Sequence, residues 1–432
     1  MTEKAAKVKD PVDSLRKGAL LSVFLTIFLD LVGFGMLIPI LPLIARDFGA
    51  SDAQATALAS IYSIGTLLAV GILGRWSDVF GRKKILMGTI GVSLGAQILT
   101  GLAGTYPLLV MARFIAGLAS GNIAVAQACI SDITSPKDRG KSMALIGIAF
   151  GMGFALGPAL GALISMFSEG HSLRNVSIAA ALLNLINLLL VVRRLPETHQ
   201  RFATGKVLEL VRKIKGELGE SHIGTWWQDA KRLLADRSFC VVLLLAFLQV
   251  FGFVGVESVL ALALSDSYQL ASSREQYLAF MYIGVMLVFI NGGITRPLIG
   301  RIGESKILTI GQFLLGSSMI LLPLFAPSQP MLWISLTLVA AGSAFASPAL
   351  SSLSSRLAPE GLQGFALGFS QTLGSLARIV GPITFGVLYQ SLNGARSLYL
   401  TSALMMLGLL IAIIGLRGVK GRLAQQTKAA AA

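Results

Sequence analysis

Four ionisable residues lie inside stretches of the chain that are otherwise almost wholly apolar: Asp30, Arg113, Glu257 and Arg378. A charge in apolar surroundings is costly unless an opposite charge or hydrogen bonds compensate it. The set holds two acids and two arginines, so pairing would leave the interior near neutral. An acid that alternately loses and regains such a partner can take up and release a proton, and this is the first chemistry that the sequence suggests.

The composition decides where these residues must lie. The chain has 432 residues, of which 54% are hydrophobic and only 13% are charged. A soluble chain carries about 25% charged residues to cover its surface. The composition also excludes disorder, and Cys129 and Cys240 fall in apolar stretches that indicate no disulfide scaffold. A polytopic membrane protein remains.

Long apolar segments recur through the whole chain. A helix that crosses a bilayer needs about 20 mostly apolar residues. Twelve such segments run approximately over residues 20–44, 53–73, 83–104, 107–130, 141–166, 173–193, 239–264, 276–298, 305–326, 331–354, 363–389 and 395–416. Because lipid offers no partner for unpaired backbone groups, we expect each segment to be a helix. The expected fold class is an all-α polytopic membrane protein.

Positive charge is distributed unevenly between the two sides of the membrane. Of the 36 Lys and Arg residues, the only ones near the loops on the side away from the termini are Arg46, Arg174, Arg274 and Arg396. Because Lys and Arg favour the cytoplasmic side, we expect both termini in the cytoplasm. Topology then explains the net charge of +15, and no nucleic-acid partner is expected. The lack of long loops favours a bacterial inner membrane over a eukaryotic membrane.

A polar stretch divides the segments into six and six. We expect a first bundle over residues 1–193, a cytoplasmic linker over 194–238, and a second bundle with a tail over 239–432. The spacing of apolar and basic residues in the linker is compatible with a helix on the membrane surface and equally with a solvated linker. Gly157–Pro158 recurs as Gly381–Pro382, and internal repeats of this kind are typical of secondary transporters.

Four motifs resemble those of a known family. LDLVGFGMLIPILP (29–42) is similar to D-x-x-G-x-G-x-x-x-P-x-x-P, and GRWSDVFGRKK (74–84) to the loop G-x-L-x-D-R-x-G-R-K-x. RFIAGLASG (113–121) is similar to R-x-x-x-G, and GFALGPALGA (153–162) to the antiporter motif G-x-x-x-G-P-x-x-G-G. A PET triplet (196–198) follows the sixth segment, whereas Trp76 and Ala162 depart mildly from the patterns. On these residues the chain resembles the major facilitator superfamily, and within it the drug:proton antiporters related to tetracycline and multidrug efflux proteins.

This resemblance implies a fold of two pseudo-symmetric six-helix bundles and a secondary active transporter. We expect a proton-coupled antiporter that exports amphipathic small molecules by alternating access, as a monomer, with the proton gradient as energy source and no cofactor. The expected partners are a small-molecule substrate and the lipid bilayer. A carrier of a specific metabolite or lipid, and a non-transporting receptor, remain alternatives. The sequence offers no catalytic or metal-ligating set, so no enzyme is expected.

By the same resemblance, the loop after the second segment is a gate. Gly74 and Gly81 would allow a tight loop, and Asp78 would contact the start of the eleventh segment. Arg82 would reach an acid at the end of the fourth segment, here Asp132. Such a latch would stabilise the outward-open state. The alternative is that the basic residues of the loop only set the topology.

Small residues and prolines mark the fifth and eleventh segments as conformational hinges. The residues are Gly153, Gly157, Pro158, Gly161, Gly381 and Pro382. Small residues let helix backbones approach closely, and proline kinks a helix. The alternative is that these residues only allow ordinary close packing.

The four intramembrane charges are expected to form two pairs that act in proton coupling. At about 1.5 Å per residue, Asp30 lies about 15 Å from the cytoplasmic end of its helix and Arg113 about 9 Å from the outer end of its own, at similar depths. Both helices line the central cavity in this fold, so we expect an Asp30–Arg113 pair or near-pair, with a static ion pair as the alternative. Glu257 and Arg378 form the second candidate pair. Residues expected to line the substrate cavity are Met36, Tyr62, Asn122, Gln127, Gln249, Asn291, Phe345 and Gln371.

Overall fold

The computed structural model describes residues 11–134, 136–167, 172–199, 201–202, 226–359, 362–392 and 394–431. Within these ranges the regular secondary structure is helical, and no strand occurs in them. The linker residues on which the surface-helix prediction rests, between 203 and 225, lie outside the described ranges.

Among the described residues, twelve helical segments are long and apolar enough to cross a membrane, which confirms the expected fold class. The first six are α1 (Pro11–Leu37), α3 (Asp52–Phe80), α4 (Arg82–Gly101), α5 with α6 (Tyr106–Ala119 and Asn122–Ile133), α7 (Pro136–Ser165) and α8 (Ser172–Arg194). The second six are α11 (Arg237–Tyr268), α12 with η1 and α13 (Ser273–Phe289, Ile290–Thr295 and Arg296–Ile302), α14 (Glu304–Leu324), α15 (Gln329–Leu357), α16 (Gln363–Ser391) and α17 (Ser397–Ala431). Short helices are α2 (Leu41–Asp47), α10 (Trp226–Leu234) and η2 (Gly394–Arg396).

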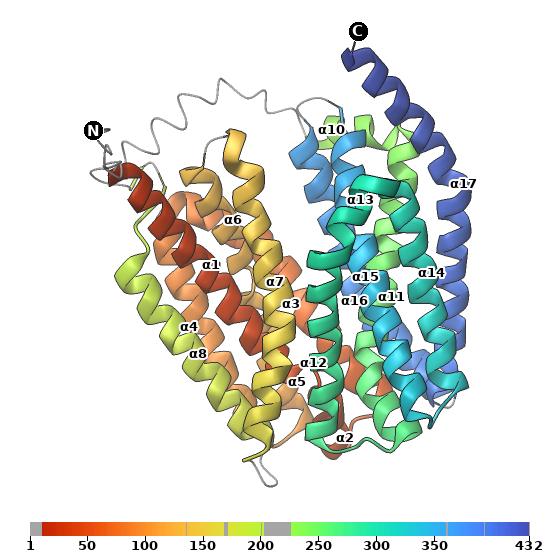
Figure 1. Cartoon of the computed structure of the whole chain (residues 1–432). Helices are drawn as coiled ribbons and strands as arrows, with labels where there is room; N and C mark the ends of the chain where they lie inside the picture. Colours follow the sequence, from red (N-terminus) through yellow and green to blue (C-terminus); the bar gives the residue numbers. More distant parts are fainter. Residues whose placement is uncertain are drawn as a thin grey trace, which may run out of the picture.

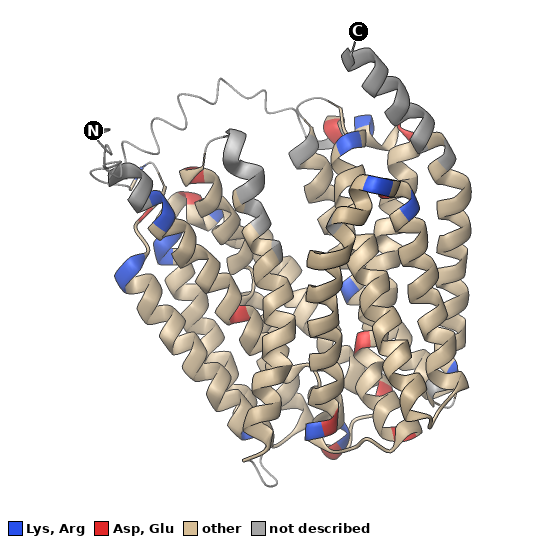
Figure 2. Ribbon diagram, in the orientation of Figure 1, with Lys and Arg blue, Asp and Glu red and all other residues tan. Residues whose placement is uncertain are grey.

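Helix α1 begins and helix α17 ends at the same end of the molecule, which we call the terminal face; the other end is the opposite face (Figure 1). Charged residues gather at these two faces, and few lie between them (Figure 2). Large apolar side chains such as Leu68 and Ile72 are exposed along the helices. This distribution suits a chain whose sides are covered by lipid.

Equivalent helices of the two halves start and stop with the same local signals. A capping box begins α3 at Ser51 and α12 at Ser272: each hydroxyl accepts the N–H three residues on, whose side chain accepts the serine N–H. The residue after α3 is Gly81, with φ of 99°, and the residue after α13 is Gly303, with φ of 81°. Glycine adopts this conformation without steric cost. The repeat seen in the sequence is therefore present in the backbone.

The two halves pack against each other mainly through α3 with α16 and α7 with α12. The described polar contacts between the halves occur toward the opposite face. There the Tyr277 hydroxyl donates to the Met36 carbonyl at 3.0 Å, and the Ala53 N–H donates to Gln390 Oε1 at 3.3 Å. The helices of the two halves diverge toward the terminal face (Figure 1). The molecule is thus closed at the opposite face. The predicted bundle boundaries at 193/194 and 238/239 remain predictions.

Candidate functional site

Asp30 lies in the interior of α1, with its carboxylate turned toward α4 and α6. Ser93 of α4 donates a hydrogen bond to Asp30 Oδ1 at 3.3 Å. The Asn122 amide of α6 lies close enough to interact with the carboxylate, although neither of its polar atoms has a hydrogen-bond partner. Neutral polar groups, rather than a fixed cation, therefore surround this acid.

Arg113 of α5 is buried, with 1% of its surface exposed. Its guanidinium carbon lies 5.7 Å from the centre of the Tyr62 ring, a cation–π distance, and its Nε has no hydrogen-bond partner. Among the described residues no ion pair joins it to Asp30, so the direct Asp30–Arg113 pair is absent. The reason is the close contact of α3 with α5: Gly117 admits the Tyr62 backbone, which brings this ring to Arg113.

Glu257 and Arg378 interact electrostatically, but at longer range than an ion pair within the described residues. Glu257 of α11 lines a pocket that is otherwise mostly apolar, with Phe154 from the first half and Phe280 from the second. Arg378 of α16 is exposed, although it lies in a membrane-spanning segment. The second predicted pair therefore stands apart in the same way as the first.

Tyr62 of α3 packs against an aromatic ring and a charged group of the first half. Its ring centre lies 4.7 Å from that of Phe34 on α1. On its other side the guanidinium carbon of Arg113 lies 5.7 Å from the ring centre. A residue expected only to line a cavity thus lies beside one of the candidate proton-coupling residues.

The other residues expected to line the cavity separate into two groups. Four of them are buried in this conformation: Met36, Asn122, Gln249 and Phe345 are 0%, 2%, 2% and 8% exposed. Of the remainder, Gln371 is exposed on α16, whereas Gln127 on α6 and Asn291 in η1 are partly exposed. The role of these residues in lining a substrate cavity stays a prediction.

The glycines of α7 provide close contacts to two partners. A Cβ at Gly153 would come 2.6 Å from Leu31 Cβ, and one at Gly157 would come 2.8 Å from Gly35 Cα, so both glycines seat α7 against α1. Gly161 instead faces the second half, where a Cβ would overlap the ring of a tyrosine on α12. The close packing expected from these small residues is present, and their role as a hinge stays a prediction.

Prolines lie inside both predicted hinge helices, Pro158 in α7 and Pro382 in α16. The neighbouring glycine in α16 packs less tightly than its equivalent in α7. A Cβ at Gly381 would lie 3.4 Å from the Phe251 carbonyl oxygen, which is an ordinary contact. The two equivalent Gly–Pro pairs therefore lie in helices that are packed at different densities.

The predicted gate loop is organised around Arg82. Its guanidinium pairs with Asp78 at 2.7 Å and with Asp132 at 3.1 Å, so the expected Arg82–Asp132 contact is present. Asp78 makes no described contact with the start of α16, because the halves are apart at the terminal face. Gly81 forms the tight turn with φ of 99°. Gly74 does not, since it lies within α3 with open space around it.

A comparison with known families decides the family of this chain. Residues 23–382 and, in a second match, 294–431 fit the sequence profile described as Major Facilitator Superfamily. The chain belongs to the Major Facilitator Superfamily.

Superfamily members with different names resemble the whole chain. The tetracycline resistance protein, class C, of Escherichia coli is 29% identical over 86% of this chain and 89% of its own length. Multidrug resistance protein 1 of Bacillus subtilis is 27% identical over 87% of this chain and 90% of its own length. The crystal structure of the human organic anion transporter MFSD10 matches with a TM-score of 0.66 at 24% identity, over 94% of this chain and all of that one. These likenesses establish a transporter, not an enzyme, and an integral membrane protein that binds small molecules.

This superfamily member anchors its gate loop through a residue that the sequence analysis did not assign. Glu197, of the PET triplet after α8, accepts hydrogen bonds from the Arg82 N–H at 2.9 Å and the Lys83 N–H at 3.1 Å. It thereby caps the first turn of α4 from a distant part of the chain. A Cβ at Gly81 would come 2.6 Å from the same carboxylate, so glycine is needed there for space as well as for φ. In the sequence, only the PET triplet pointed to this role of Glu197.

The second half of this superfamily fold carries a counterpart of the Arg82–Asp132 pair with inverted charge. Glu304, which begins α14, pairs with Arg356 near the end of α15 at 2.7 Å. Arg82 and Asp132 hold the equivalent places at the start of α4 and the end of α6. Opposite charges at positions related by the repeat were the signal that could have revealed this pair.

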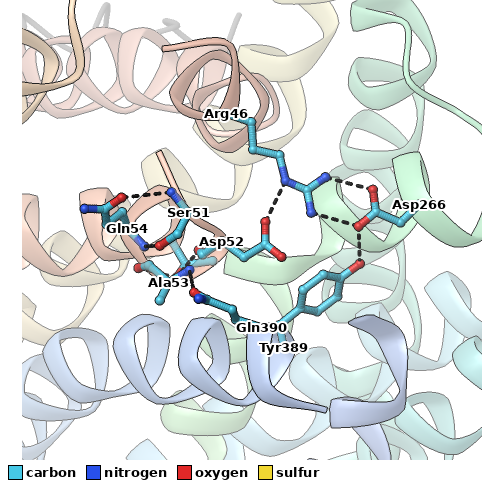
Figure 3. A network of polar contacts seen from close by, with 9 residues as sticks. Arg46, Ser51, Asp52, Ala53, Gln54, Asp266, Tyr389 and Gln390 are labelled. Carbon is cyan, nitrogen blue, oxygen red and sulfur yellow. Dashed lines mark hydrogen bonds and ion pairs between the residues drawn. The ribbon is translucent and has the colours of Figure 1, made fainter. Parts of the chain in front are cut away.

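A second missed group lies at the opposite face of this superfamily member. Arg46 of α2 pairs with Asp52 of the first half and with Asp266 of the second, and Tyr389 also binds Asp266 (Figure 3). Arg46 was one of the few basic residues on its side of the membrane. An arginine on the side of the membrane that has few basic residues could have been expected to have an acidic partner.

Proposed function

We propose that this chain is a proton-coupled antiporter that exports amphipathic small molecules across the bacterial inner membrane by alternating access. The names of its tetracycline and multidrug resistance relatives support the substrate class. The helix segment GFALGPALGA, which resembles the antiporter motif, supports exchange. The protein acts as a monomer without a cofactor.

The bias of Lys and Arg supports the orientation in this proposal. The terminal face, where most of these residues lie, faces the cytoplasm, and the opposite face lies outside. The closed opposite face and the diverging helices at the terminal face then correspond to an inward-facing state.

The observation that carries the proposal is the arrangement of the four intramembrane charges. Asp30, Arg113, Glu257 and Arg378 come from both halves, and none of them forms a direct ion pair with another. Unpaired charges at membrane depth are expensive and are retained for function. Arg113 lies over the Tyr62 ring at 5.7 Å and not beside an acid, so its charge is available to an acid or a substrate that approaches it.

This arrangement links substrate and proton through charge balance. When Asp30 or Glu257 binds a proton, the interior gains one positive charge, and a cationic or zwitterionic substrate is bound less favourably. Proton entry and substrate release therefore favour each other. Each proton that moves inward provides about 2.3 kcal/mol per 100 mV of membrane potential to drive export.

Proton movement in everted membrane vesicles tests the proposal. We expect tetracycline or a lipophilic cation to release protons from vesicles that hold the wild-type protein, and Asp30→Asn to abolish this release while still reaching the membrane. Asp47→Asn is the matched control, because Asp47 is an exposed acid on α2 outside the spans. Unchanged release by Asp30→Asn would remove Asp30 from the coupling step.

A second candidate function is transport of an organic anion or another specific metabolite. The buried Arg113, whose Nε lacks a partner, and the exposed Arg378 offer positive charge to such a substrate. A solved structure of similar fold is named as an organic anion transporter. Exchange of a labelled organic anion, without proton release by cations, would favour this candidate over the first.

A further inference from the structure

We propose that Arg46, Asp52, Asp266 and Tyr389 form an ion-pair lock that holds the opposite face closed and that opens by exchange of a single partner. In this lock Asp52 is the permanent partner of Arg46, and Asp266 is the partner that is released. The inference concerns the movement of the two halves and does not depend on which substrate or ion is carried.

The guanidinium of Arg46 uses all three nitrogens and joins both halves. Its Nη1 and Nη2 donate to the two carboxylate oxygens of Asp266, each at 2.8 Å, and its Nε donates to Asp52 Oδ1 at 2.7 Å (Figure 3). Asp266 lies near the end of α11 in the second half, whereas Asp52 begins α3 in the first half. A bidentate arginine–carboxylate contact is stronger and more directional than a single ion pair.

Neighbouring groups fix the orientation of the lock. The Tyr389 hydroxyl of α16 donates to Asp266 Oδ2 at 3.0 Å, so this carboxylate is held from its own half. Next to it, Gln390 Oε1 accepts the Ala53 N–H at 3.3 Å, in the first turn of α3. The lock therefore connects α2 and α3 of one half with α11 and α16 of the other.

Arg46 stays protonated within the lock. Hydrogen bonding to Asp266 raises the pKa of Arg46 well above its ordinary value, against an opposing effect of partial burial. Arg46 is thus positive at every physiological pH. The side chains of Arg46, Asp52 and Asp266 remain 26%, 24% and 38% exposed, so water can replace the contacts when the halves separate.

The double pairing explains how such a lock can open reversibly. Removing the only partner of a partly buried charge is costly, because the charge is left uncompensated. Arg46 and Asp52 belong to the same half and are only one short loop apart, so they can stay paired when α11 moves away. The cost of opening is then confined to the Asp266 contacts. Tyr389 remains with Asp266 in the second half and compensates the released carboxylate in part.

The separation of the two halves at the opposite face tests the lock directly. The experiment uses the full chain in lipid nanodiscs, with Cys129 and Cys240 replaced by alanine. Spin labels on Thr105→Cys and Gln329→Cys, which are exposed near the opposite face in the first and second halves, report the distance by pulsed electron resonance. We expect one short distance in the parent protein. Arg46→Gln and Asp266→Asn should each increase the ratio of the long-distance to the short-distance population about tenfold, as expected for loss of charged hydrogen bonds.

Three further variants distinguish the lock from a general effect of surface charge. The Arg46→Gln/Asp266→Asn double variant should open no further than either single variant, because both remove the same contact. Asp52→Asn should open the face less than Asp266→Asn. Arg274→Gln, which removes an exposed arginine near the same face without a described ion pair, should leave the distance unchanged.

The proposal has defined failures. If Arg46→Gln and Asp266→Asn both kept the distances of the parent protein, these contacts would not be what holds the opposite face closed. If Arg274→Gln opened the face equally, the effect would be one of general surface charge. If Asp52→Asn opened the face as much as Asp266→Asn, the claim that Asp52 is the permanent partner of Arg46 would be wrong. If Arg46→Gln fails to elute as a monodisperse protein, Arg46→Lys takes its place. It keeps the charge, loses the bidentate geometry and should open the face to an intermediate degree.

Discussion

The two ends of the molecule use charged residues for different purposes. At the opposite face, Arg46 binds an acid from each half, so its contacts depend on the position of one half against the other. At the terminal face, Arg82 binds Asp78 and Asp132, and all three belong to the first half. The Arg46 cluster therefore forms only when the two halves are close together, whereas the Arg82 cluster stabilises the first half alone.

A recognisable sequence motif and a position between moving parts are separate properties of a charged cluster. The loop with Arg82 has the more recognisable sequence, yet in this conformation it joins no two moving parts. The contact of Arg46 with Asp266 has no recognisable motif, yet it spans the interface. Whether a cluster can act as a switch depends on which rigid parts it connects, and not on the number of its charges.

Enlarging a glycine at the contact between α3 and α16 should disturb the closed opposite face most strongly. A Cβ at Gly386 would overlap Thr56 Oγ1, so Gly386→Ala should force the halves apart at the opposite face and lower transport at least tenfold. Gly368→Ala on the same helix is the control, because a Cβ added there would have no atom within 4 Å. Vesicle transport and the spin-label distance measure the effect. Equal activity of the two alanine variants would contradict it.

Removing the charge of Arg82 should give a smaller effect, and one of a different kind. Arg82→Gln breaks contacts with both acids inside one half and should destabilise that half by about 2 kcal/mol, without opening the opposite face. Thermal unfolding in detergent measures the loss, and the spin-label distance should stay as in the parent. Arg75→Gln, at an exposed arginine in the last two turns of α3, serves as the control. An opened opposite face in Arg82→Gln would break the distinction between the two clusters.

The cap supplied by Glu197 should give the smallest effect. Glu197→Gln keeps one acceptor oxygen but removes the negative charge from the first turn of α4, which should cost about 1 kcal/mol. Glu197→Ala removes both acceptors and should cost more. Thermal unfolding of the two variants in parallel checks the order, and a Glu197→Ala protein as stable as the parent would show that the loop needs no cap.

The sequence predicted the fold because lipid allows few solutions. Apolar segments of bilayer length must become helices, and the distribution of Lys and Arg indicates which ends lie together. The contact between Arg82 and Asp132 was also predictable, since the resemblance named both partners. These features depend on segment length, charge and motif, which a sequence states directly.

The central site could be predicted only in part, because its geometry depends on helix rotation and on conformational state. Tyr62 and Met36 were both predicted to line the cavity, yet the Tyr62 ring lies 5.7 Å from the Arg113 guanidinium, whereas Met36 is wholly buried. The close approach of α3 to α5 at Gly117 places the Tyr62 ring beside Arg113, and a sequence does not state such an approach. The contact of Arg46 with Asp266 exists only where the halves are closed, so no single segment could reveal it.

The inverted pair of Glu304 and Arg356 has a consequence for the ancestry of the chain. Two identical six-helix units related by a two-fold axis would carry the same residue at both equivalent places, so that every mutation would appear twice. Here the equivalent places hold an arginine and a glutamate at one position, and an aspartate and an arginine at the other. Such a reversal needs copies that mutate independently. A single chain allows each half to diverge in this way, whereas the helix starts at Ser51 and Ser272 have stayed alike.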